Sequence, residues 1–444
     1  MKIAIIGGGI SGLATAFYIL QEKPEASITL FEKSDSLGGK MKTKEVGGFF
    51  FEEGSNGFLS NKPDTLELVK LSGCDDVLLR SDDNARIRYI YKDALHRLPE
   101  SPKAFLFSPL LTFRGKLRVA CEFFVKPKTD ESDETLQSFG YRRVGREMTD
   151  AFLDAMVAGI FASKPDAISV NAAFPAVVRL ERKYGGLFKG MIAKKKKEAG
   201  PGGVLMSFEK GVSTFIERLA KSMNIQIKKN LHVKKIEKNG EKYILHVNNE
   251  KKEFDTVILS TPAYESANML REIDSELAKQ LDDIEYSPIS VVGLGYDTFS
   301  HDLNGFGLLS TTSAKKDILG VLWDSSIFKD RAPSGKKSLR VMIGGQRNPE
   351  LALKSEEELI KIAKEGIKET MGVTDAPTVA YVKRYERGIP NYRVGHNAKM
   401  QVLFDKLSEH KGLYLSSNAY FGVGLNDCVG NAKKVALELI KEIA

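Results

Sequence analysis

Cysteine is scarce in this sequence of 444 residues, and long apolar runs are missing. The three cysteines, Cys74, Cys121 and Cys428, lie far apart and form no Cys-x-x-Cys pair and no cluster with histidine. This spacing argues against a disulfide framework and against a metal site, and unpaired thiols suit the reducing cytoplasm. No stretch approaches the roughly 20 apolar residues that a membrane-spanning helix needs. We therefore expect a cytoplasmic protein with no bound metal and no membrane span.

The first residues lack the features of a secretory signal peptide. Lys2 is followed by only four apolar residues before Gly7, and no small-residue cleavage site follows. The glycines there belong to a folded motif, so we expect the fold to start with the chain. The sequence also contains no visible internal repeat.

The net charge of +8 is a mild signal. A basic surface can attract nucleic acid, anionic lipid or anionic small molecules. The lysines and arginines are spread along the chain, however, and we expect no nucleic-acid partner. The one dense run is four lysines at residues 194–197, before a glycine- and proline-rich stretch. Such a run is typical of a solvated loop, and contact with lipid headgroups is the alternative.

The N-terminal segment has the pattern of a βαβ unit. An apolar run at residues 2–6 ends at three glycines, and apolar residues then recur at helical spacing from Ile10 to Tyr18. A second apolar run, at residues 27–32, ends in an acid. The order strand, glycine turn, helix, strand predicts an α/β fold that opens with a Rossmann-like unit.

Gly7, Gly9 and Gly12 form the G-x-G-x-x-G fingerprint of a dinucleotide-binding turn. The first glycine allows the sharp turn, the second lets backbone amides approach a pyrophosphate, and the third lets the helix pack closely. The phosphates then lie against the free amides of the helix N-terminus. Glu32 follows at the expected interval, where a carboxylate can accept both ribose hydroxyls and argues against NADP. The fingerprint alone does not separate FAD from NAD.

Local signals predict several further elements. Pro63 and Gly73 suit the two ends of a helix over residues 63–71. Asn239-Gly240 indicates a hairpin between two alternating strands, and Ser355 with Glu358 forms a capping box. Residues 102–193 look mostly helical, with a helix start near 133–135, and the glycines and proline at 200–203 indicate a boundary. Several strands follow, and a C-terminal amphipathic helix is expected from about Asn431.

The front of the helical region, residues 102–124, is unusually aromatic. Its phenylalanines and leucines lie among Lys103, Arg114, Lys116, Arg118 and Lys126. This mixture suits a lipid interface, where apolar groups enter the bilayer and cations meet headgroups. The hypothesis is a peripheral membrane contact, and the alternative is that these aromatics form the core of a helical subdomain.

Segments after the fingerprint resemble the flavin amine-oxidase superfamily. L-G-G-K at residues 37–40 resembles the segment whose glycines pass beneath the FAD phosphates and whose basic residue meets them. F-E-E-G-S-N at residues 51–56 resembles the next flavin-contacting loop. Val233 matches a strand position that contacts adenine, with an ordinary strand valine as the alternative. The resemblance implies FAD as the cofactor, held by Gly7, Gly8, Gly9, Ile10, Ser11, Gly12, Glu32, Lys33, Gly39, Lys40, Gly54, Ser55, Asn56, Gly57, Val233, Tyr385, Val423, Gly424 and Leu425.

Within that superfamily the chain resembles the protoporphyrinogen and coproporphyrinogen oxidases nearly from end to end. The matching segments include A-G-I-F-A at 158–162, S-F-E-K-G-V at 207–212, I-P-N-Y-R-V-G-H at 389–396 and N-A-Y-F-G-V-G-L-N-D-C at 418–428. Two departures stand out, because the family usually has Trp where this chain has Tyr385, and Gln where it has Asn391.

The resemblance implies oxidation of a porphyrinogen to the porphyrin in haem biosynthesis, with oxygen as the acceptor. The family holds a propionate of the tetrapyrrole with an arginine that precedes an L-H-x-L-P segment, here residues 95–99. Arg88 is the best match and Arg86 is the runner-up, and a surface arginine is the alternative for either. We find no nucleophile-base pair, and His96 and His396 are expected to stabilise loops. The rival functions are a carotenoid desaturase, an amine oxidase, or a prenyl-GTPase dissociation inhibitor, which shares the fold without FAD.

The expected architecture has three parts. A discontinuous Rossmann-like FAD-binding domain is predicted from residues 1–80, 202–285 and 410–444. A helical domain is expected over residues 81–201, and a mixed-sheet substrate-binding domain over residues 286–409.

Overall fold

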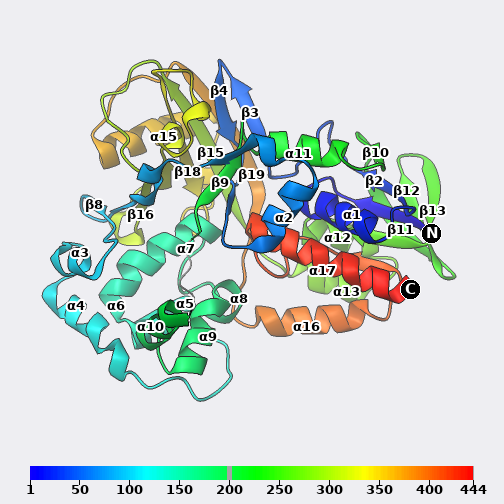
Figure 1. The fold of residues 1–444 in the computed structure, drawn as a ribbon, viewed down its shortest axis with the longest axis horizontal. Coiled ribbons are helices and arrows are strands. Elements are labelled where there is room, and N and C mark those ends of the chain that lie inside the picture. The colour runs from blue at the N-terminus through cyan, green and yellow to red at the C-terminus, as the bar shows by residue number, and fades with distance from the viewer. Residues whose placement is uncertain (198–202, 444) are drawn as a thin grey trace.

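The structure is a computed structural model that describes residues 1–197 and 203–443 (Figure 1). The glycine- and proline-rich segment predicted as a boundary therefore lies largely outside the described residues, and so do the side chains of the lysine run at 194–197. Among the helices of the described ranges, none combines the length and the apolar character needed to cross a membrane.

A five-stranded parallel sheet forms one end of the molecule, and its strands lie in the order β10-β2-β1-β14-β20. The central strands are apolar runs that helices cover on both faces, as is usual for parallel sheets. The predicted βαβ unit at the N-terminus is therefore confirmed. The strands are β1 (Lys2–Ile6), β2 (Ser27–Phe31), β10 (Gln226–Lys228), β14 (Thr256–Leu259) and β20 (Leu413–Leu415).

Each face of this sheet has its own apolar core. One face is covered by α1 (Ile10–Glu22), α11 (Val212–Lys221) and α17 (Leu425–Ile443), and α1 and α17 lie side by side (Figure 1). The opposite face carries β11 (Val233–Asn239), β12 (Lys242–Val247), β13 (Glu250–Phe254), α12 (Ala263–Leu270), α13 (Ser275–Asp282) and α16 (His396–Leu407).

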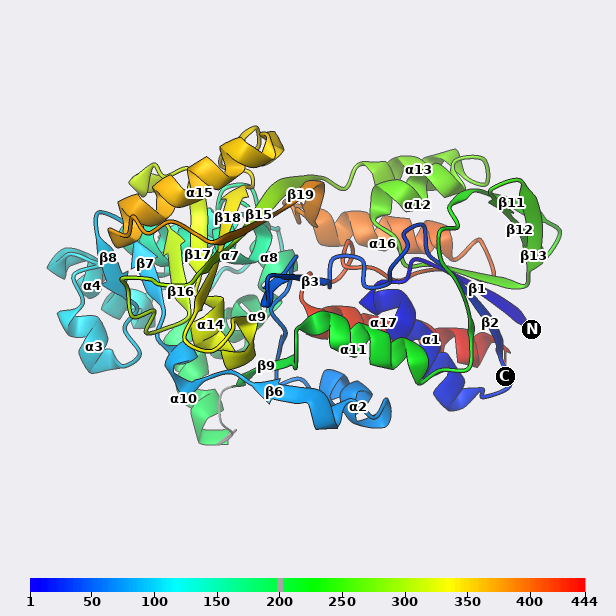
Figure 2. The same cartoon turned by 90° about the horizontal axis from the view of Figure 1, so that it is seen from above.

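A mixed seven-stranded sheet lies at the other end of the long axis, in the order β19-β15-β18-β17-β16-β7-β8 (Figure 2). The amphipathic helix α15 (Glu356–Met371) covers one face, and α7 (Asp154–Phe161) packs on the other. The predicted mixed sheet is confirmed. Its strands are β7 (Tyr89–Tyr91), β8 (Leu95–Arg97), β15 (Tyr286–Tyr296), β16 (Gly307–Ser310), β17 (Ile318–Leu322), β18 (Lys337–Gly344) and β19 (Val379–Pro390).

Two small sheets lie between these ends. The β3-β4 hairpin leads out of the first βαβ unit, and a three-stranded sheet has the order β5-β9-β6. The elements are β3 (Thr43–Val46), β4 (Phe49–Glu52), β5 (Phe58–Leu59), β6 (Leu78–Arg80) and β9 (Leu205–Phe208), with α14 (Asp324–Ile327) close by.

A helical unit packs against the seven-stranded sheet. Its interior holds an ion pair between Glu122 and Arg143, both fully buried. The Glu122 carboxylate also accepts hydrogen bonds from the backbone N–H groups of Leu187 and Phe188 at the start of α10. The helices are α3 (Pro102–Phe107), α4 (Phe113–Ala120), α5 (Leu136–Arg143), α6 (Arg146–Met148), α7, α8 (Val170–Ala173), α9 (Pro175–Tyr184) and α10 (Leu187–Lys197).

The architecture departs from the expected division at two places. The strands β7 and β8 fall inside the range 81–201 expected for the helical domain, but β7 pairs in parallel with β16 and extends the seven-stranded sheet. The helix α16 falls inside the range 286–409, but Met400 and Leu403 bury their side chains in the core under the five-stranded sheet. Tertiary burial decides both cases: Tyr89 and Tyr91 of β7 pack on the core under α15, and α16 packs on the core of the five-stranded sheet.

Most local predictions hold. The helix α2 spans Pro63–Leu71, the hairpin pairs Asn239 with Lys242, and Ser355 and Glu358 form the capping box of α15. The prediction for the C-terminal helix was wrong by six residues, because α17 begins at Leu425 and not near Asn431. Asn, Asp and Gly make its first turns poor helix formers, but Leu425, Cys428 and Val429 are buried against α1 and stabilise them.

Candidate functional site

The glycines of the fingerprint have different roles in the turn between β1 and α1. Gly7 has a φ of +107°, and an added Cβ would lie 2.6 Å from the carbonyl oxygen of Ser260. A Cβ on Gly12 would overlap the carbonyl oxygen of Gly7. Gly9 has extended backbone, and the nearest atom to its Cβ position is 3.9 Å away. The fold therefore requires Gly7 and Gly12, whereas the space at Gly9 is left open.

The 37–40 loop lies directly against this turn. The backbone N–H of Gly38 donates to the carbonyl of Gly8 at 2.8 Å, and Gly9 and Gly38 form an isolated bridge. A Cβ on Gly39, which is exposed, would come no closer than 3.5 Å, to the Cα of Gly9. Two glycine turns thus form an open cradle at the N-terminus of α1, the place where a pyrophosphate binds in dinucleotide-binding folds.

Glu32 is buried beside this cradle. Its carboxylate accepts hydrogen bonds from the backbone N–H groups of Gly8 and Ser34, both at 2.8 Å. The predicted contact with ribose hydroxyls would use the remaining lone pairs and stays a prediction. Lys33 points elsewhere and pairs with Glu265 at 2.7 Å.

Lys40 places a cation under the cradle. Its Nζ donates to the carbonyls of Gly388 and Arg387 on β19 and lies 5.4 Å from the ring centre of Tyr286. Burial lowers the pKa of Lys40 to about 8, and no carboxylate within the described ranges pairs with it. An anionic ligand in the cradle would supply the missing counter-charge.

The 52–57 loop is held from the seven-stranded sheet. Arg340 of β18 donates to the carbonyls of Glu52 and Gly54 at 2.7 and 3.3 Å. Asp324 fixes this guanidinium in a bidentate pair at 2.5 and 3.0 Å. Gly57 is required, because a Cβ there would overlap the carbonyl oxygen of Met206. The predicted residues Gly54, Ser55 and Asn56 thus lie on a fixed loop next to Lys40.

The Glu52 carboxylate completes this buried anchor. It pairs with Arg331 at 3.1 Å and accepts hydrogen bonds from the Thr43 hydroxyl and the Val212 N–H. Burial raises the pKa of Glu52 to about 7, although Arg331 and Arg340 both act to lower it. Four charged side chains therefore share one buried cluster between the 52–57 loop and the sheet.

The C-terminal glycine turn closes the site from a third side. The Tyr392 hydroxyl accepts from the Gly422 N–H at 2.8 Å and donates to the carbonyl of Asn418 at 2.6 Å. This brings Val423, Gly424 and Leu425, at the start of α17, toward the end of β19. Val233 is buried in the core and pairs with Val247, and its predicted contact with adenine stays a prediction.

The two candidate histidines contact loops. His396 is buried, stacks on Tyr392 at 4.1 Å and has its Nε2 2.9 Å from the carbonyl oxygen of Tyr420. Burial lowers the pKa of His396, so the ring is neutral at pH 7. His96 lies 2.5 Å from Asp93 in the β7–β8 turn. Neither arrangement indicates a proton-transfer role.

An apolar cluster lies where α7 packs on the seven-stranded sheet, and we call it the apolar wall. It combines Ala158 of α7 and Ala162 just after it with Ile289, Leu319, Met342, Tyr385 and Ile389 of the sheet. The last three sheet residues named, Met342, Tyr385 and Ile389, are partly exposed, whereas the other members are buried. The predicted contact of Tyr385 with FAD stays a prediction.

Arg88 lies on the same side of that sheet. Tyr89 packs on Trp323 in the core under α15, so the alternation of strand residues places Arg88 on the opposite face, with Ile90. The Arg88 guanidinium is exposed, lies 5.1 Å from the ring of Phe306 and has no carboxylate partner in the described structure. Arg86, by contrast, lies 3.9 Å from Asp83.

Motif analysis missed the residues that hold the loop in place, above all Arg340, Asp324 and Arg331. One signal was available, a single arginine between apolar residues in β18 (Lys337–Gly344). A buried charge of that kind needs a partner, which the structure gives as Asp324, 16 positions away. The contact with the carbonyl of Glu52 was not identifiable, since Arg340 and Glu52 are 288 positions apart.

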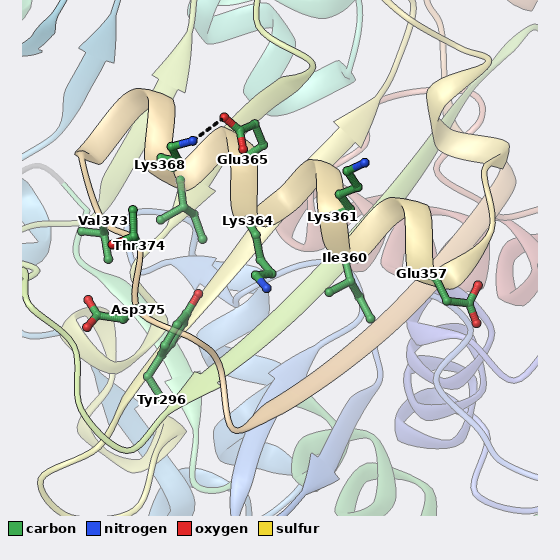
Figure 3. Close-up of a pocket in the computed structure, with 11 residues that line it drawn as sticks. Tyr296, Glu357, Ile360, Lys361, Lys364, Glu365, Lys368, Val373, Thr374 and Asp375 are labelled. Carbon is green, nitrogen blue, oxygen red and sulfur yellow. Dashed lines mark hydrogen bonds and ion pairs between the residues drawn. The ribbon is translucent and has the colours of Figure 1, made fainter.

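A separate hollow of about 370 Å³ lies away from all these residues, between α15 and the end of β15 (Figure 3). Tyr296 and Val373 form its floor, and surface lysines and acids of α15 form its rim. It has no contact with the cradle, and its mixed charges select no ligand.

Comparisons with known proteins agree with this geometry. A family model described as flavin containing amine oxidoreductase matches residues 10–440. The chain is 28% identical to the coproporphyrinogen III oxidase of Bacillus subtilis, covering 97% of this chain and 96% of that protein. It is also 28% identical to the chloroplastic protoporphyrinogen oxidase of Nicotiana tabacum, over 99% of this chain and 85% of that one.

Among solved structures, one named "Putative protoporphyrinogen oxidase" from Exiguobacterium sp. 255-15 superimposes with a TM-score of 0.88 at 27% identity, and 99% of each chain is covered. The family match confirms the prediction of a flavin cofactor, and the open pyrophosphate cradle fits its dinucleotide form, FAD. This chain belongs to the flavin containing amine oxidoreductase family.

Proposed function

We propose that the protein is an FAD-dependent porphyrinogen oxidase that converts protoporphyrinogen IX or coproporphyrinogen III to the porphyrin, with oxygen as the acceptor. The observation that carries this proposal is the open cradle at Gly9 and Gly39. The apolar wall around Tyr385 and the cation of Arg88, which has no carboxylate partner among the described residues, support it. Relatives that carry both porphyrinogen oxidase names over nearly the whole chain support it.

The residues around the cradle would hold FAD in a defined way. Backbone amides at Gly9 and the α1 N-terminus would meet the pyrophosphate, Lys40 would add a cation, and Glu32 would bind the ribose. Bound FAD supplies the redox chemistry, accepting a hydride from the substrate and passing electrons to oxygen. The protein's contribution is to fix the substrate against the apolar wall and to keep water out.

The test of this function is oxygen-dependent turnover of both porphyrinogens, followed by porphyrin fluorescence. We expect at least one of the two to be oxidised well above its spontaneous rate, and anaerobic assays to stop product formation. Flavin-free protein serves as the control for non-enzymatic oxidation. A flavin-loaded protein that oxidises neither porphyrinogen but oxidises amines or desaturates a carotenoid would contradict the proposal.

Gly9→Val should produce a folded protein that cannot bind FAD. The Gly9 backbone is extended and its Cβ position is open, so valine fits the fold but fills the cradle. We expect circular dichroism like that of flavin-free wild type and no flavin absorbance after FAD is added. Gly12→Ala is the contrast and should lose folded structure, because its Cβ overlaps the backbone at Gly7. A Gly9→Val protein with a full flavin complement would contradict the assignment of the cradle as the pyrophosphate site.

Arg88→Ala should weaken substrate binding while FAD stays bound. Arg88 is exposed in the free protein. A charged hydrogen bond to a propionate that the bound substrate shields from water contributes roughly 1.5–3 kcal/mol. We therefore expect KM to rise about tenfold or more, with flavin content and reducibility unchanged. Arg86→Ala is the matched control. If Arg86→Ala alone raises KM, the assigned arginine is wrong; if neither does, the carboxylate is held elsewhere.

The region predicted to meet a membrane has an exposed aromatic surface, formed by α3, α4 and the turn Cys121–Phe124. Phe107 and Phe113 are each 75% exposed and Phe124 is 86% exposed, whereas Phe105 packs into the helical core. Exposed large apolar side chains gathered in one region support an interaction site there. Its exposed basic neighbours, Lys103, Arg114 and Lys126, favour anionic lipid.

Replacing Phe107, Phe113 and Phe124 together with serine should abolish binding to anionic vesicles. Each Phe buried in lipid contributes roughly 1.5–3 kcal/mol, so losing three lowers partitioning far more than tenfold. Vesicle flotation at low salt measures this, with Val402→Ser, an exposed apolar residue on α16, as the control. If the wild-type protein does not bind the vesicles under these conditions, the proposed membrane contact is contradicted.

A further inference from the structure

Glu53 belongs to the 52–57 loop, and its side chain faces β19, the edge strand of the seven-stranded sheet. It follows β4 directly, and its backbone N–H donates to the carbonyl of Lys42 at 2.8 Å. Its side chain is buried. The three residues that surround its carboxylate, Tyr381, Lys383 and Tyr385, alternate along β19 and so project from one face of that strand.

The Glu53 carboxylate uses both oxygens on these neighbours. The Tyr381 hydroxyl donates to one oxygen, and the Tyr385 hydroxyl donates to the other at 3.4 Å. The Lys383 ammonium pairs with that second oxygen at 3.2 Å and lies 5.5 Å from the ring centre of Tyr385. Burial, and then the charge of Glu53, raises the pKa of Tyr385, so its phenol remains a donor at neutral pH.

The two tyrosines differ in what their rings touch. The Tyr381 ring stacks on Phe51 of β4, with ring centres 6.4 Å apart. The Tyr385 ring belongs to the apolar wall and packs with Met342 and Ile389 beside Ala158 of α7. One carboxylate therefore holds a tyrosine that stacks on Phe51 and a tyrosine of the wall.

We propose that Glu53 is a positioning residue that fixes the ring of Tyr385 in the wall where the substrate binds. Glu53 accepts a hydrogen bond from the Tyr385 phenol, and Lys383, which pairs with Glu53, lies over the ring face. If the carboxylate is removed, the buried phenol loses its acceptor and the ammonium loses its counter-ion, so the ring is free to turn. The role of the wall in binding the substrate rests on the proposed function, but the positioning of Tyr385 by Glu53 does not.

The experiment compares Glu53→Leu, Glu53→Gln, Tyr385→Phe and Tyr381→Phe in the holoenzyme. The substitution Glu53→Gln keeps one acceptor oxygen, and Tyr381→Phe is the matched control because it removes a hydrogen bond to the same carboxylate from a ring outside the wall. Two readouts are used. The first is fluorine NMR of protein labelled with fluorotyrosine, with the signals of Tyr381 and Tyr385 assigned from the Phe variants. The second is the separate determination of KM and kcat for the porphyrinogen.

We expect Glu53→Leu to shift the Tyr385 resonance and to raise KM about threefold to tenfold, with a smaller change in kcat. Tyr385→Phe should raise KM similarly, Glu53→Gln should restore most of both properties, and Tyr381→Phe should leave the Tyr385 resonance and KM unchanged. An unchanged Tyr385 resonance in Glu53→Leu, or a KM rise reproduced by Tyr381→Phe, would overturn the proposal. If Glu53→Leu does not fold, the KM of Tyr385→Phe decides: a rise of about threefold to tenfold supports the proposal, and an unchanged KM overturns it. If the wild type oxidises no porphyrinogen, the proposed function fails and the NMR result alone decides the role of Glu53.

Discussion

Four charged side chains are buried between the 52–57 loop and the seven-stranded sheet, and the relative position of these two parts depends on them. Glu52, Asp324, Arg331 and Arg340 are each at most 4% exposed. Removing four charges from water has a large desolvation cost, which only complete pairing offsets. Arg340 of the sheet donates to the loop carbonyls, and Glu52 at the start of the loop pairs with Arg331. The loop therefore cannot shift without losing these buried contacts.

This constraint explains how segments far apart in the chain form one site. The cradle at Gly9 and Gly39 belongs to the five-stranded sheet, whereas the apolar wall belongs to the seven-stranded sheet. The 52–57 loop connects them. Arg340 of β18 and the β19 partners of Glu53 bind it to the seven-stranded sheet, and the Glu53 N–H donates to the carbonyl of Lys42, next to the cradle loop. In the proposed function, a cofactor in the cradle and a substrate on the wall would thereby be held at fixed positions relative to each other, which a reaction between two bound molecules requires.

The sequence predicted those parts of the structure that depend on local chemistry. The glycines at residues 7–12, the hairpin at 239–240 and the capping box at Ser355 are set by backbone geometry over a few residues, and all three are present. The start of α17 and the sheet membership of β7 were not predictable in this way, because burial against distant elements decides them. The same holds for the candidate site. The cradle was visible as a motif, but the contacts of Arg340 with the loop carbonyls and of Glu53 with β19 join residues more than 280 positions apart.

The contacts that the last segment of the chain makes with β14 and α1 have a consequence for folding. The strand β20 adds to the edge of β14, and α17 packs on α1, so the five-stranded sheet is completed by residues 413–443. Until these residues leave the ribosome, the apolar strand β14 presents an open edge with unpaired backbone groups. An edge of that kind is a template for pairing with another chain, and pairing across such a long sequence separation is slow. The interval before the last strand docks is therefore the stage of synthesis at which this protein most needs protection from aggregation.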